Sequence, residues 1–566
     1  MSKRFIIVGG VAGGASVAAR LRRLDENAQI QIYDKGPDIA FSNCCLPNFL
    51  SREVPEADNL ILFTPADFKK MFNLEALTGH EVIAIHPQEH TVLVRNLSTG
   101  EELEDRYDAL ILSPGAKAVV PPSIPGITGS NVFTVRNVAD VRALDHYLHT
   151  HNVQDVAVVG GGFIGLEVAE NLTKTGRYTV SVAEAAPQVM MPLDEDLVQI
   201  LHKELLDRGV NLYLGDALAA VHPDKITLAS GKEIPAGCVV LAIGVKPDLD
   251  FAVRSGLAVG ETGGALVNAY YETNLPDVYA VGDCIETFNA LTRAKTKLPL
   301  AGPAQRAARA CADHLMGHFA QNRGVIGSSC LRLFDLNIAA TGLNERECQK
   351  HGIPYMTSYV LPFDRVGVIP GANVIHLKLI FEDPTGRLLG CQAVGKGNVV
   401  DRVDVAAALL GKGGTLQDLA QTELCYAPTF RTAKDALHFA AYVGLNLLSG
   451  EFKQVPMREV RALVESGATI IDVREAPAYK RSHIKGAINI PLSQIRERYR
   501  EIPQDVPVYL HCRTAWYSYY AVRALQGLGF RNIINLQGSF LGLSYYEYFR
   551  DKTTGRTPIL TDYNFF

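Results

Sequence analysis

Two stretches of this sequence repeat one pattern: an apolar run, a glycine-rich turn, a helical segment, and a second apolar run followed by an acid. The first copy consists of the apolar run Phe5–Val8, the turn from Gly9 to Gly14, the helical segment Ala15–Leu24 and the apolar run Ile30–Tyr33. The second consists of Val156–Val159, the turn from Gly160, the helical segment Gly165–Thr173 and the run Thr179–Ala183. Each copy has the pattern of a β–α–β unit, whose two strands must lie parallel. The repeat therefore predicts an α/β protein with two nucleotide-binding domains.

Composition excludes several other classes of protein. Of 566 residues, 47% are hydrophobic and 20% are charged, which is typical of a globular chain. A net charge of −5 argues against general binding of nucleic acid or of a membrane surface. The sequence has no uncharged apolar run of the ~18 residues that a membrane span needs. The apolar run near the N-terminus stops at Gly9 and arginines follow, so it is interpreted as a strand rather than a secretory signal, and we expect a cytoplasmic protein.

The cysteines do not indicate a disulfide scaffold, because there are only ten in this long chain. Most of them are expected to be buried core residues. The sequence holds no Cys-x-x-Cys pair and no cysteine–histidine cluster with the spacing of a zinc site. We therefore predict no metal site.

The first glycine turn has the features of a dinucleotide-binding loop. Glycines between a strand and a helix let the backbone approach a pyrophosphate, and the helix N-terminus supplies N–H donors. Val11 stands where the middle glycine of a strict Gly-x-Gly-x-x-Gly motif would be. Asp34 ends the second strand about 20 residues further on, where an acceptor for a ribose hydroxyl is expected. The residues predicted to bind the dinucleotide are Gly9, Gly10, Ala12, Gly13 and Asp34.

The second glycine turn is a full Gly-x-Gly-x-x-Gly motif, with Gly160, Gly162 and Gly165 as its glycines. Glu184 lies about 20 residues later, at the end of the next strand. A carboxylate there accepts hydrogen bonds from a free ribose diol and repels a 2′-phosphate. We therefore predict NADH as the nicotinamide cofactor, with NADPH as the alternative because Arg177 lies nearby in the sequence.

A third element, the segment Thr273–Asp283, is predicted to be an apolar strand that ends in Gly282 and Asp283. In flavoproteins with two dinucleotide domains, an aspartate at this place binds the ribityl chain of FAD. The turn Ile111–Gly115, which contains Pro114, resembles the strand end at which the chain leaves the FAD domain. These elements together predict FAD, with Ala301 as a further contact. FAD and NADH in one chain imply that a hydride passes from the nicotinamide to the flavin, which then reduces another substrate.

Cys44 and Cys45 follow the first β–α–β unit. A thiolate beside a flavin can take electrons from it, and that environment can lower the pKa of the thiol. Adjacent cysteines can pair only through a strained ring, so a dithiol relay between the two is not expected. The expected chemistry uses one cysteine, which forms a mixed disulfide, a persulfide or a sulfenic acid. A buried cysteine pair in a turn is the purely structural alternative.

Three groups of residues resemble the coenzyme A-disulfide reductases: Gly9–Ala15, Asn43-Cys44 with Leu46-Pro47, and Leu424–Pro428 with Lys434-Asp435. The resemblance extends from residue 1 to about residue 446 and identifies a single-cysteine, FAD- and NAD(P)H-dependent disulfide oxidoreductase. It implies that Cys44 is the redox cysteine and that coenzyme A contacts Ser16, Arg20, Arg23, Asn43 and Lys434. It also implies a homodimer in which Tyr426 reaches the partner subunit's active site.

Two departures from that family affect the expected substrate. A small residue usually follows the family's redox cysteine, whereas this chain has Cys45. The family's Tyr-Tyr before a Pro-Gly turn is replaced by Val368-Ile369, which leaves Tyr426 as the one active-site phenol. These changes disfavour efficient turnover of coenzyme A disulfide. They favour a smaller sulfur substrate, such as a coenzyme A persulfide, or a relay through Cys45.

The C-terminal residues resemble a rhodanese domain. The resemblance rests on Ile470–Arg474, His483–Pro491 and Val508–Cys512, the last being a strand that ends in a cysteine ahead of a helix predicted over Tyr519–Leu528. N–H groups of such a loop and the helix dipole stabilise a thiolate, so Cys512 is predicted to carry a persulfide. Ala515 and Tyr517 stand where active rhodaneses commonly have a glycine and an arginine, which leaves a binding or inactive domain as the alternative.

The expected architecture is α/β, with two Rossmann-like dinucleotide-binding domains, an α+β dimerisation domain and a rhodanese-like α/β domain. The expected boundaries are 1–120 with 246–325 for the FAD domain, 121–245 for the NAD(P)H domain, 326–446 for the dimerisation domain, 447–455 for a linker and 456–566 for the rhodanese-like domain.

The hypothesis is an NADH-dependent reductase of persulfide or polysulfide sulfur. Cys512 or free coenzyme A persulfide delivers the sulfur, Cys44 attacks it, and the products are coenzyme A and sulfide. Reduction of coenzyme A disulfide is the nearest alternative. A single-cysteine NADH oxidase or peroxidase, and a flavin-based redox sensor whose terminal module only binds partners, are alternatives from other classes. No nucleic-acid or membrane partner is expected.

Overall fold

The computed structural model describes residues 2–565, which fold into two compact units. The first unit comprises the chain up to Pro187 together with Tyr213–Val325, and the second comprises Gln188–Leu212 and the chain from Ile326 onward. Among residues 2–565, no helix has both the length and the apolar character that crossing a bilayer requires.

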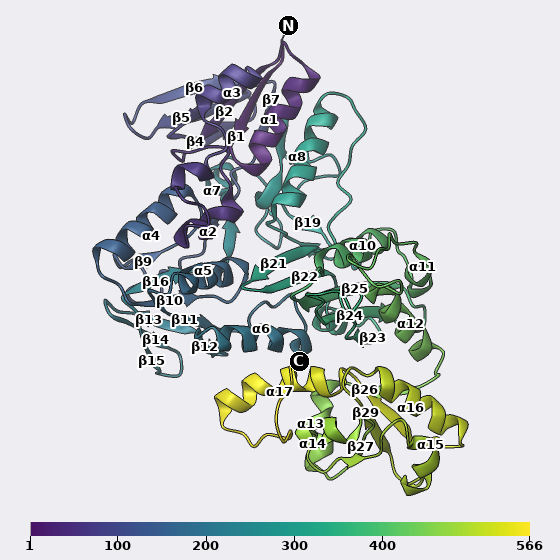
Figure 1. Ribbon diagram of the computed structural model, residues 1–566. Coiled ribbons are helices and arrows are strands. Elements are labelled where there is room, and N and C mark those ends of the chain that lie inside the picture. The colour runs from purple at the N-terminus through teal and green to yellow at the C-terminus, as the bar shows by residue number, and fades with distance from the viewer. Residues whose placement is uncertain (1, 566) are drawn as a thin grey trace. The chain divides into compact units, whose positions relative to one another are not determined.

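A five-stranded parallel sheet is the centre of the first nucleotide-binding fold (Figure 1). Its strand order is β18-β7-β1-β2-β3, with β1 at Arg4–Val8, β2 at Gln29–Asp34, β3 at Glu75–Thr78, β7 at Ala109–Leu112 and β18 at Val278–Ala280. Helices α1 (Ala12–Leu24) and α8 (Ala301–Leu315) pack on each other beside this sheet (Figure 1). The first predicted β–α–β unit is confirmed, because β1 and β2 pair in parallel from Arg4 with Gln29 to Val8 with Tyr33.

The strand predicted over Thr273–Asp283 is much shorter than expected. Only β18 pairs with the sheet, and the residues before it form a turn in which the Thr273 N–H donates to the Val278 carbonyl at 2.9 Å. Pro276 has no N–H to contribute to a strand, and Asp277 takes a left-handed φ of +54°.

The second nucleotide-binding fold repeats the plan of the first. Its sheet has the order β12-β11-β10-β16-β9, with β9 at Val132–Phe133, β10 at Asp155–Val159, β11 at Thr179–Glu184, β12 at Asn211–Leu214 and β16 at Cys238–Leu241. Its helices include α4 (Val138–Thr150) and α5 (Phe163–Lys174), and β10 pairs in parallel with both β11 and β16. The second predicted β–α–β unit is therefore confirmed.

Smaller elements complete the first unit. Its two three-stranded antiparallel sheets are β4 (His80–His86), β5 (Thr91–Asn96) and β6 (Glu102–Arg106), and β13 (Leu218–Val221), β14 (Lys225–Leu228) and β15 (Glu233–Pro235). Its two-stranded pairs are β8 (Ala116–Ala118) with β17 (Val245–Pro247) and β19 (Thr287–Phe288) with β20 (Lys295–Thr296). Its short helices are α2 (Leu46–Leu50), α3 (Pro65–Phe72) and α7 (Asp250–Arg254), and its 3-10 turns are η1 (Asn43–Cys45), η2 (Ala57–Leu60) and η3 (Gly282–Cys284).

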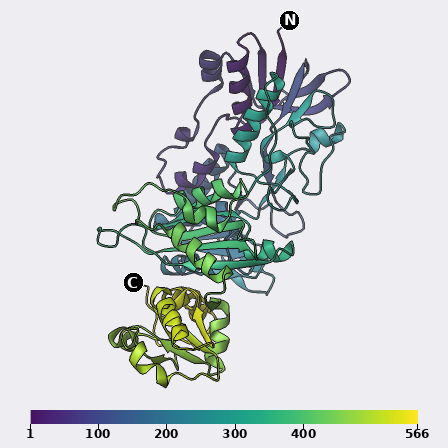
Figure 2. The same ribbon diagram turned by 90° about the vertical axis from the view of Figure 1, so that its right-hand side faces the viewer.

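The second unit begins with an antiparallel sheet of five strands. The order is β21 (Ser329–Leu333), β22 (Leu336–Gly342), β25 (Leu388–Gly395), β24 (Ile375–Glu382) and β23 (Tyr355–Val360). Helix α10 (Val400–Leu410) packs on β22 and β25, and α12 (Ala436–Leu448) packs on β23 and β24, as Figure 2 shows for the green helices over this sheet. The other helices of this part are α6 (Glu195–Asp207), α9 (Glu345–Lys350) and α11 (Leu416–Gln421).

The C-terminal residues form a parallel sheet covered on both faces. The strand order is β26 (Lys453–Val455), β30 (Ile533–Leu536), β29 (Val508–His511), β27 (Thr469–Asp472) and β28 (Ile488–Asn489). The helices are α13 (Met457–Glu465), α14 (Ala476–Arg481), α15 (Ile495–Arg498), α16 (Trp516–Gly527) and α17 (Ser539–Thr554), with the 3-10 turn η4 at Tyr499–Glu501. Ile470 packs in an apolar cluster with residues of α13 and α17, and its neighbour Ile471 packs in a second cluster with residues of α16. The two side chains lie on opposite faces of the sheet because side chains alternate along a strand. The stretch 447–455, predicted as a linker, contains the end of α12 and all of β26.

A buried lysine fills the centre of an acidic cluster in the second unit. The fully buried Lys378 ammonium lies 3.1, 2.8 and 2.5 Å from carboxylate oxygens of Asp194, Asp196 and Glu345. The three carboxylates converge closely enough to serve as metal ligands, but the ammonium already bonds to each of them. Charge compensation by Lys378 therefore explains why three acids lie together inside the fold.

Candidate active site

The first glycine turn is shaped by contacts that only glycine can make. Gly9 has a φ of +94°, and a Cβ there would lie 2.2 Å from the carbonyl oxygen of Ser113. A Cβ on Gly14 would lie 1.8 Å from the carbonyl oxygen of Gly9. No side chain in the described part of the chain caps the N-terminus of α1, so N–H groups of its first turn can meet an anion such as a pyrophosphate.

The second glycine turn repeats this geometry. Gly160 has a φ of +110°, and a Cβ there would lie 2.4 Å from the carbonyl oxygen of Ala242. A Cβ on Gly165 would lie 1.9 Å from the carbonyl oxygen of Gly160. Among residues 2–565, no atom outside the neighbouring residues of the chain lies within 4 Å of a Cβ on Gly162, so this glycine provides space beside the loop rather than a special backbone shape. Both turns therefore fit the phosphates of a dinucleotide.

The two predicted ribose acceptors are held in the same way. The Asp34 carboxylate accepts the N–H groups of Gly10 and Gly36, both at 2.7 Å. The Glu184 carboxylate accepts those of Gly161 at 2.6 Å and Ala186 at 2.7 Å. Each carboxylate thus ties the end of the second strand to its glycine turn, which is the place that a ribose acceptor requires.

The chain after β7 and the chain after β18 meet at the first glycine turn. A Cβ on Gly13 would lie 2.4 Å from the Ser113 hydroxyl oxygen and 3.6 Å from Cγ2 of Val281. Burial raises the pKa of Asp283, against an opposing effect of Arg136. The remaining predicted contacts lie at the ends of nearby elements. Pro114 and Gly115 follow β7, Gly282 follows β18, and Ala301 is the first residue of α8. This cradle of glycines and loop backbone fits FAD.

Cys44 is exposed in η1, which leads into α2, and Cys45 is half-buried. Both are free thiols. Desolvation and then the charge of Glu167 raise the pKa of Cys44, while Arg136 lowers it. The protein residues alone therefore do not lower the pKa of the Cys44 thiol, which is the change that we expect beside a flavin.

Glu167 and Arg136 are site candidates that the sequence did not identify. Glu167 lies in the first half of α5, on which α2 packs, and burial followed by repulsion from Glu170 raises its pKa to about 7. Arg136 donates to the Ala116 carbonyl at 2.9 Å, and its Nε is buried without a hydrogen-bond partner among residues 2–565. A carboxyl group that titrates near neutral pH can accept and return a proton.

The helix face predicted to bind coenzyme A is partly engaged within the chain. The Ser16 hydroxyl donates to the Ala12 carbonyl at 2.6 Å, and the Arg20 guanidinium forms an ion pair with Asp313 at 2.6 Å. Arg23 is exposed, and Oδ1 of Asn43 is buried with no hydrogen-bond partner in the described part of the chain. Of these four predicted coenzyme A contacts, Arg23 and Asn43 therefore best retain the capacity to form polar contacts with a ligand.

Tyr426 and Lys434 lie in the second unit, between α11 and α12. Tyr426 is 51% exposed. The Lys434 ammonium lies over the rings of Phe439 and Tyr442, 5.3 and 5.8 Å from their centroids. That Tyr426 reaches a partner subunit's active site, and that Lys434 contacts coenzyme A, both stay predictions.

The C-terminal cysteine occupies the loop that the sequence predicted. Cys512 follows β29 directly, is buried, and donates its N–H to the Ser539 hydroxyl at 2.9 Å. The loop ends at Ala515, whose φ of +67° is left-handed, and α16 begins at Trp516, three residues before its predicted start. The glycine expected at position 515 would adopt this conformation without strain. The departure at Ala515 therefore leaves the shape of the loop intact.

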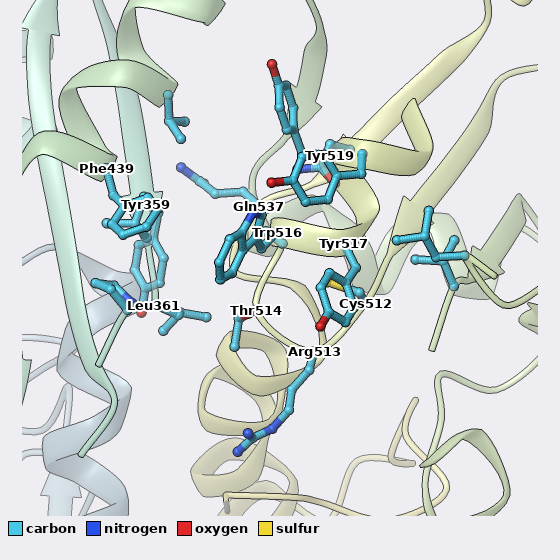
Figure 3. Close-up of a pocket in the computed structure, with 18 of the residues that line it drawn as sticks. Tyr359, Leu361, Phe439, Cys512, Arg513, Thr514, Trp516, Tyr517, Tyr519 and Gln537 are labelled. Carbon is cyan, nitrogen blue, oxygen red and sulfur yellow. The ribbon is translucent and has the colours of Figure 1, made fainter. Parts of the chain in front are cut away.

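A cavity of about 1300 Å³ opens beside Cys512 within the second unit. The loop Cys512–Tyr517 forms one wall, and the other includes the end of β23 and residues of α12. The Trp516 ring lies 5.8 Å from the Phe439 ring and stands between the Tyr359, Leu361 and Phe439 side and Cys512 (Figure 3). The cavity was not apparent from the sequence, because its walls come from segments far apart in the chain.

The sequence matches three protein families. Residues 3–308 match the pyridine nucleotide-disulphide oxidoreductases, residues 329–437 match the dimerisation domain of the same enzymes, and residues 457–544 match the rhodanese-like domain. The coenzyme A disulfide reductase of Staphylococcus haemolyticus is 33% identical over 448 residues, which cover 79% of this chain and all of that protein.

Two solved structures resemble almost the whole chain. Reduced CoADR-RHD from Bacillus anthracis is 38% identical, with a TM-score of 0.93 over 97% of this chain and 99% of that one. The NAD-dependent persulfide reductase from A. fulgidus is 32% identical, with a TM-score of 0.90 over 95% and 99% of the two chains. The predicted resemblance and fold class are therefore confirmed.

Proposed function

Because the chain belongs to the pyridine nucleotide-disulphide oxidoreductase family, we propose that it is an NADH-dependent reductase of persulfide and polysulfide sulfur. Coenzyme A persulfide is the proposed substrate, and coenzyme A and sulfide are the proposed products. The homodimer suggested by the dimerisation domain is the proposed working state. The single observation that carries this proposal is the free, exposed Cys44 thiol in a chain that also contains a rhodanese-like cysteine loop.

The family implies FAD and a nicotinamide cofactor, and the residues of this chain fit both. FAD would be held by the first glycine turn, Asp34, the loops after β7 and β18, and the start of α8, and NADH by the second glycine turn and Glu184. Bound there, the pair supplies the two electrons that reopen a sulfur–sulfur bond on Cys44.

Cys44 acts as a nucleophile toward the sulfur–sulfur bond of a persulfide R–S–SH. Attack of its thiolate on the outer sulfur forms a Cys44 persulfide and releases the thiol R–SH. Two electrons and two protons then convert that persulfide to the Cys44 thiol and hydrogen sulfide. The whole reaction consumes R–S–SH, NADH and one proton and yields R–SH, hydrogen sulfide and NAD⁺.

Glu167 supports this chemistry as a proton carrier. Its pKa of about 7 means that both protonation states are populated at neutral pH. The neutral form can return a proton to a leaving sulfur, and the ionised form can take one from the Cys44 thiol.

Cys512 is the proposed sulfur carrier of the same protein. Covalent linkage of a carrier domain to a reductase raises the local concentration of one cysteine near the other without any new contact. The loop that holds Cys512 ends at the N-terminus of α16, where N–H groups and the helix dipole favour an anionic sulfur.

Reduction of coenzyme A disulfide is the second candidate. It is favoured by the similarity of 79% of this chain to the whole coenzyme A disulfide reductase of Staphylococcus haemolyticus. The exposed Cys44 suits a mixed disulfide with coenzyme A as well as a persulfide.

An acceptor panel tests the proposal. NADH oxidation by the native protein is measured with coenzyme A persulfide, coenzyme A disulfide, polysulfide, hydrogen peroxide and oxygen. We expect the persulfide to give the highest kcat/KM. A higher value with the disulfide would support the second candidate, and rapid oxidation with oxygen alone would support an oxidase.

A further inference from the structure

We propose that the cavity beside Cys512 is a binding site for organic persulfides with an extended apolar arm and an anionic end. The proposal rests on the carrier role proposed above for Cys512 and deepens it by naming the class of sulfur donor. The cavity belongs entirely to the second unit, so it is defined without reference to the first.

The walls of the cavity are mostly apolar, and many of them are aromatic. The aromatic lining residues are Tyr359, Phe363, Phe439, Tyr442, Phe452, Trp516, Tyr517, Tyr519 and Tyr520. Aliphatic side chains such as Leu361, Val443 and Leu492 also line the cavity. A surface of this kind gains free energy by taking an alkyl or aryl group out of water, and a small hydrated anion such as thiosulfate carries no such group.

A nucleophile stands on one wall of this cavity. Cys512 lines it, and the neighbouring Trp516 ring bridges toward the opposite wall through its contact with Phe439 (Figure 3). Trp516 is 53% exposed although it is a large aromatic residue, which leaves a broad apolar surface for a ligand to cover. A donor bound along that surface brings its sulfur to Cys512.

The charged residues that line the cavity favour an anionic group at the end of the donor away from its sulfur. Four lining residues are basic, Lys434, Arg474, Arg496 and Arg513, and one, Glu475, is acidic. Arg474 is neutralised by Asp472, to which its guanidinium binds at 2.9 and 3.0 Å through Nε. The remaining three basic residues outnumber Glu475, so the cavity favours a carboxylate, sulfonate or phosphate at the far end of the donor.

The transfer step needs no oxidant or reductant. The Cys512 thiolate attacks the outer sulfur of R–S–SH, a bond forms between the two sulfurs, and the S–S bond of the donor breaks. R–S⁻ leaves and takes up a proton, and Cys512 carries the persulfide. One sulfur–sulfur bond replaces another, so the electrons balance.

A donor series on the full-length protein tests the inference. The protein is treated with thiosulfate, with methyl hydropersulfide and with ω-carboxyalkyl hydropersulfides of increasing chain length, and the rate of sulfur addition to the Cys512 peptide is followed by mass spectrometry. We expect the rate constant at low donor concentration to rise about threefold for each added methylene until the cavity wall is covered. The methyl esters should react more slowly than the corresponding acids. Equal rates along the series, or thiosulfate as the fastest donor, would overturn the inference.

A pair of phenylalanine variants locates the site. Phe439→Ala removes part of the cavity wall, whereas Phe430→Ala removes a ring that is 74% exposed and does not line the cavity. We expect Phe439→Ala to slow loading by the long donors at least fivefold, and by more than it slows loading by methyl hydropersulfide. Equal rates for the two variants with the long donors would contradict the assignment.

The same assay in a Cys44→Ser background separates this inference from the proposed reductase activity. Chain-length-dependent loading of Cys512 in that background supports the donor site even if no persulfide is reduced. The native protein could also reduce persulfide with NADH while none of these organic donors loads Cys512. That result would support the reductase activity and refute the donor site.

Discussion

Asp34 and Glu184 occupy the same place in two separate β–α–β units, where each carboxylate accepts the N–H of the second residue of its glycine turn. The bonds to Gly10 and Gly161 measure 2.7 and 2.6 Å. The equivalence extends to Gly9 with Gly160 and Gly14 with Gly165, whose missing Cβ atoms leave room for the same backbone oxygens of each unit. The two predicted dinucleotide-binding sites of the chain thus share one local backbone structure.

Glu184 should determine the choice of nicotinamide. Glu184→Ala removes the carboxylate that repels a 2′-phosphate, so we expect the ratio of kcat/KM for NADPH to that for NADH to rise about tenfold or more. Steady-state oxidation of both nucleotides measures this ratio. Glu233→Ala, a surface change in the same domain, is the control and should leave it unchanged. An unaltered preference in the Glu184 variant would refute the role.

Glu167 should control the reactivity of Cys44. Glu167→Gln removes a negative charge that raises the pKa of Cys44, so the thiol ionises at lower pH. We expect the alkylation of Cys44 at pH 7.5, followed on its peptide in flavin-free protein, to be about three to ten times faster. Glu89→Gln, an exposed carboxylate of the same unit, should have no effect. A slower reaction would contradict the predicted effect of the Glu167 charge on the pKa of Cys44.

Ala515 should make the Cys512 loop less stable than a glycine would. Its φ of +67° costs about 1 kcal/mol relative to glycine. We therefore expect Ala515→Gly to slow native-state hydrogen exchange of the amides at the start of α16 about fivefold. Ala524→Gly, in the interior of the same helix, should have the opposite effect of similar size. Faster exchange in the Ala515 variant would mean that the loop gains nothing from the change.

Lys378 should be essential to the folded state at alkaline pH. Lys378→Met leaves three carboxylates without their buried partner, which we expect to lower the free energy of unfolding by about 3–5 kcal/mol at pH 8. Without the ammonium, burial and mutual repulsion raise the carboxyl pKa values above those of the unfolded chain. Their protonated forms therefore stabilise the fold at low pH, and this stabilisation is lost as the pH rises through the raised values.

Urea unfolding at pH 5 and pH 8 measures this effect. The loss caused by Lys378→Met should be smaller at pH 5. Lys396→Met, at an exposed lysine, should change the unfolding midpoint little at either pH. An equal loss in the Lys378 variant at both pH values would contradict the coupling.

The features that could be predicted from the sequence are those that depend on local pattern. Both β–α–β units, their glycine turns and the acids Asp34 and Glu184 follow from short-range periodicity and spacing. The turn before β18 could not be predicted, because the apolar pattern conceals the effect of Pro276 and Asp277 on the backbone.

The features that could not be predicted depend on contacts between distant segments. Glu167 lies in a helix whose motif indicates only a phosphate-binding role, and its effect on Cys44 arises when α2 packs on α5. The cavity beside Cys512 joins residues from Tyr359 to Gln537, and no local pattern relates them. Long-range packing therefore supplies the parts of the site that decide proton transfer and donor choice.

The most direct test of the proposed function measures sulfide release and NADH oxidation together, without oxygen, with coenzyme A persulfide as substrate. The native protein should release one sulfide for each NADH consumed, Cys44→Ser should do neither, and Cys45→Ser should retain the stoichiometry. Persulfide-dependent sulfide release coupled to NADH oxidation at an undiminished rate in Cys44→Ser would contradict the account.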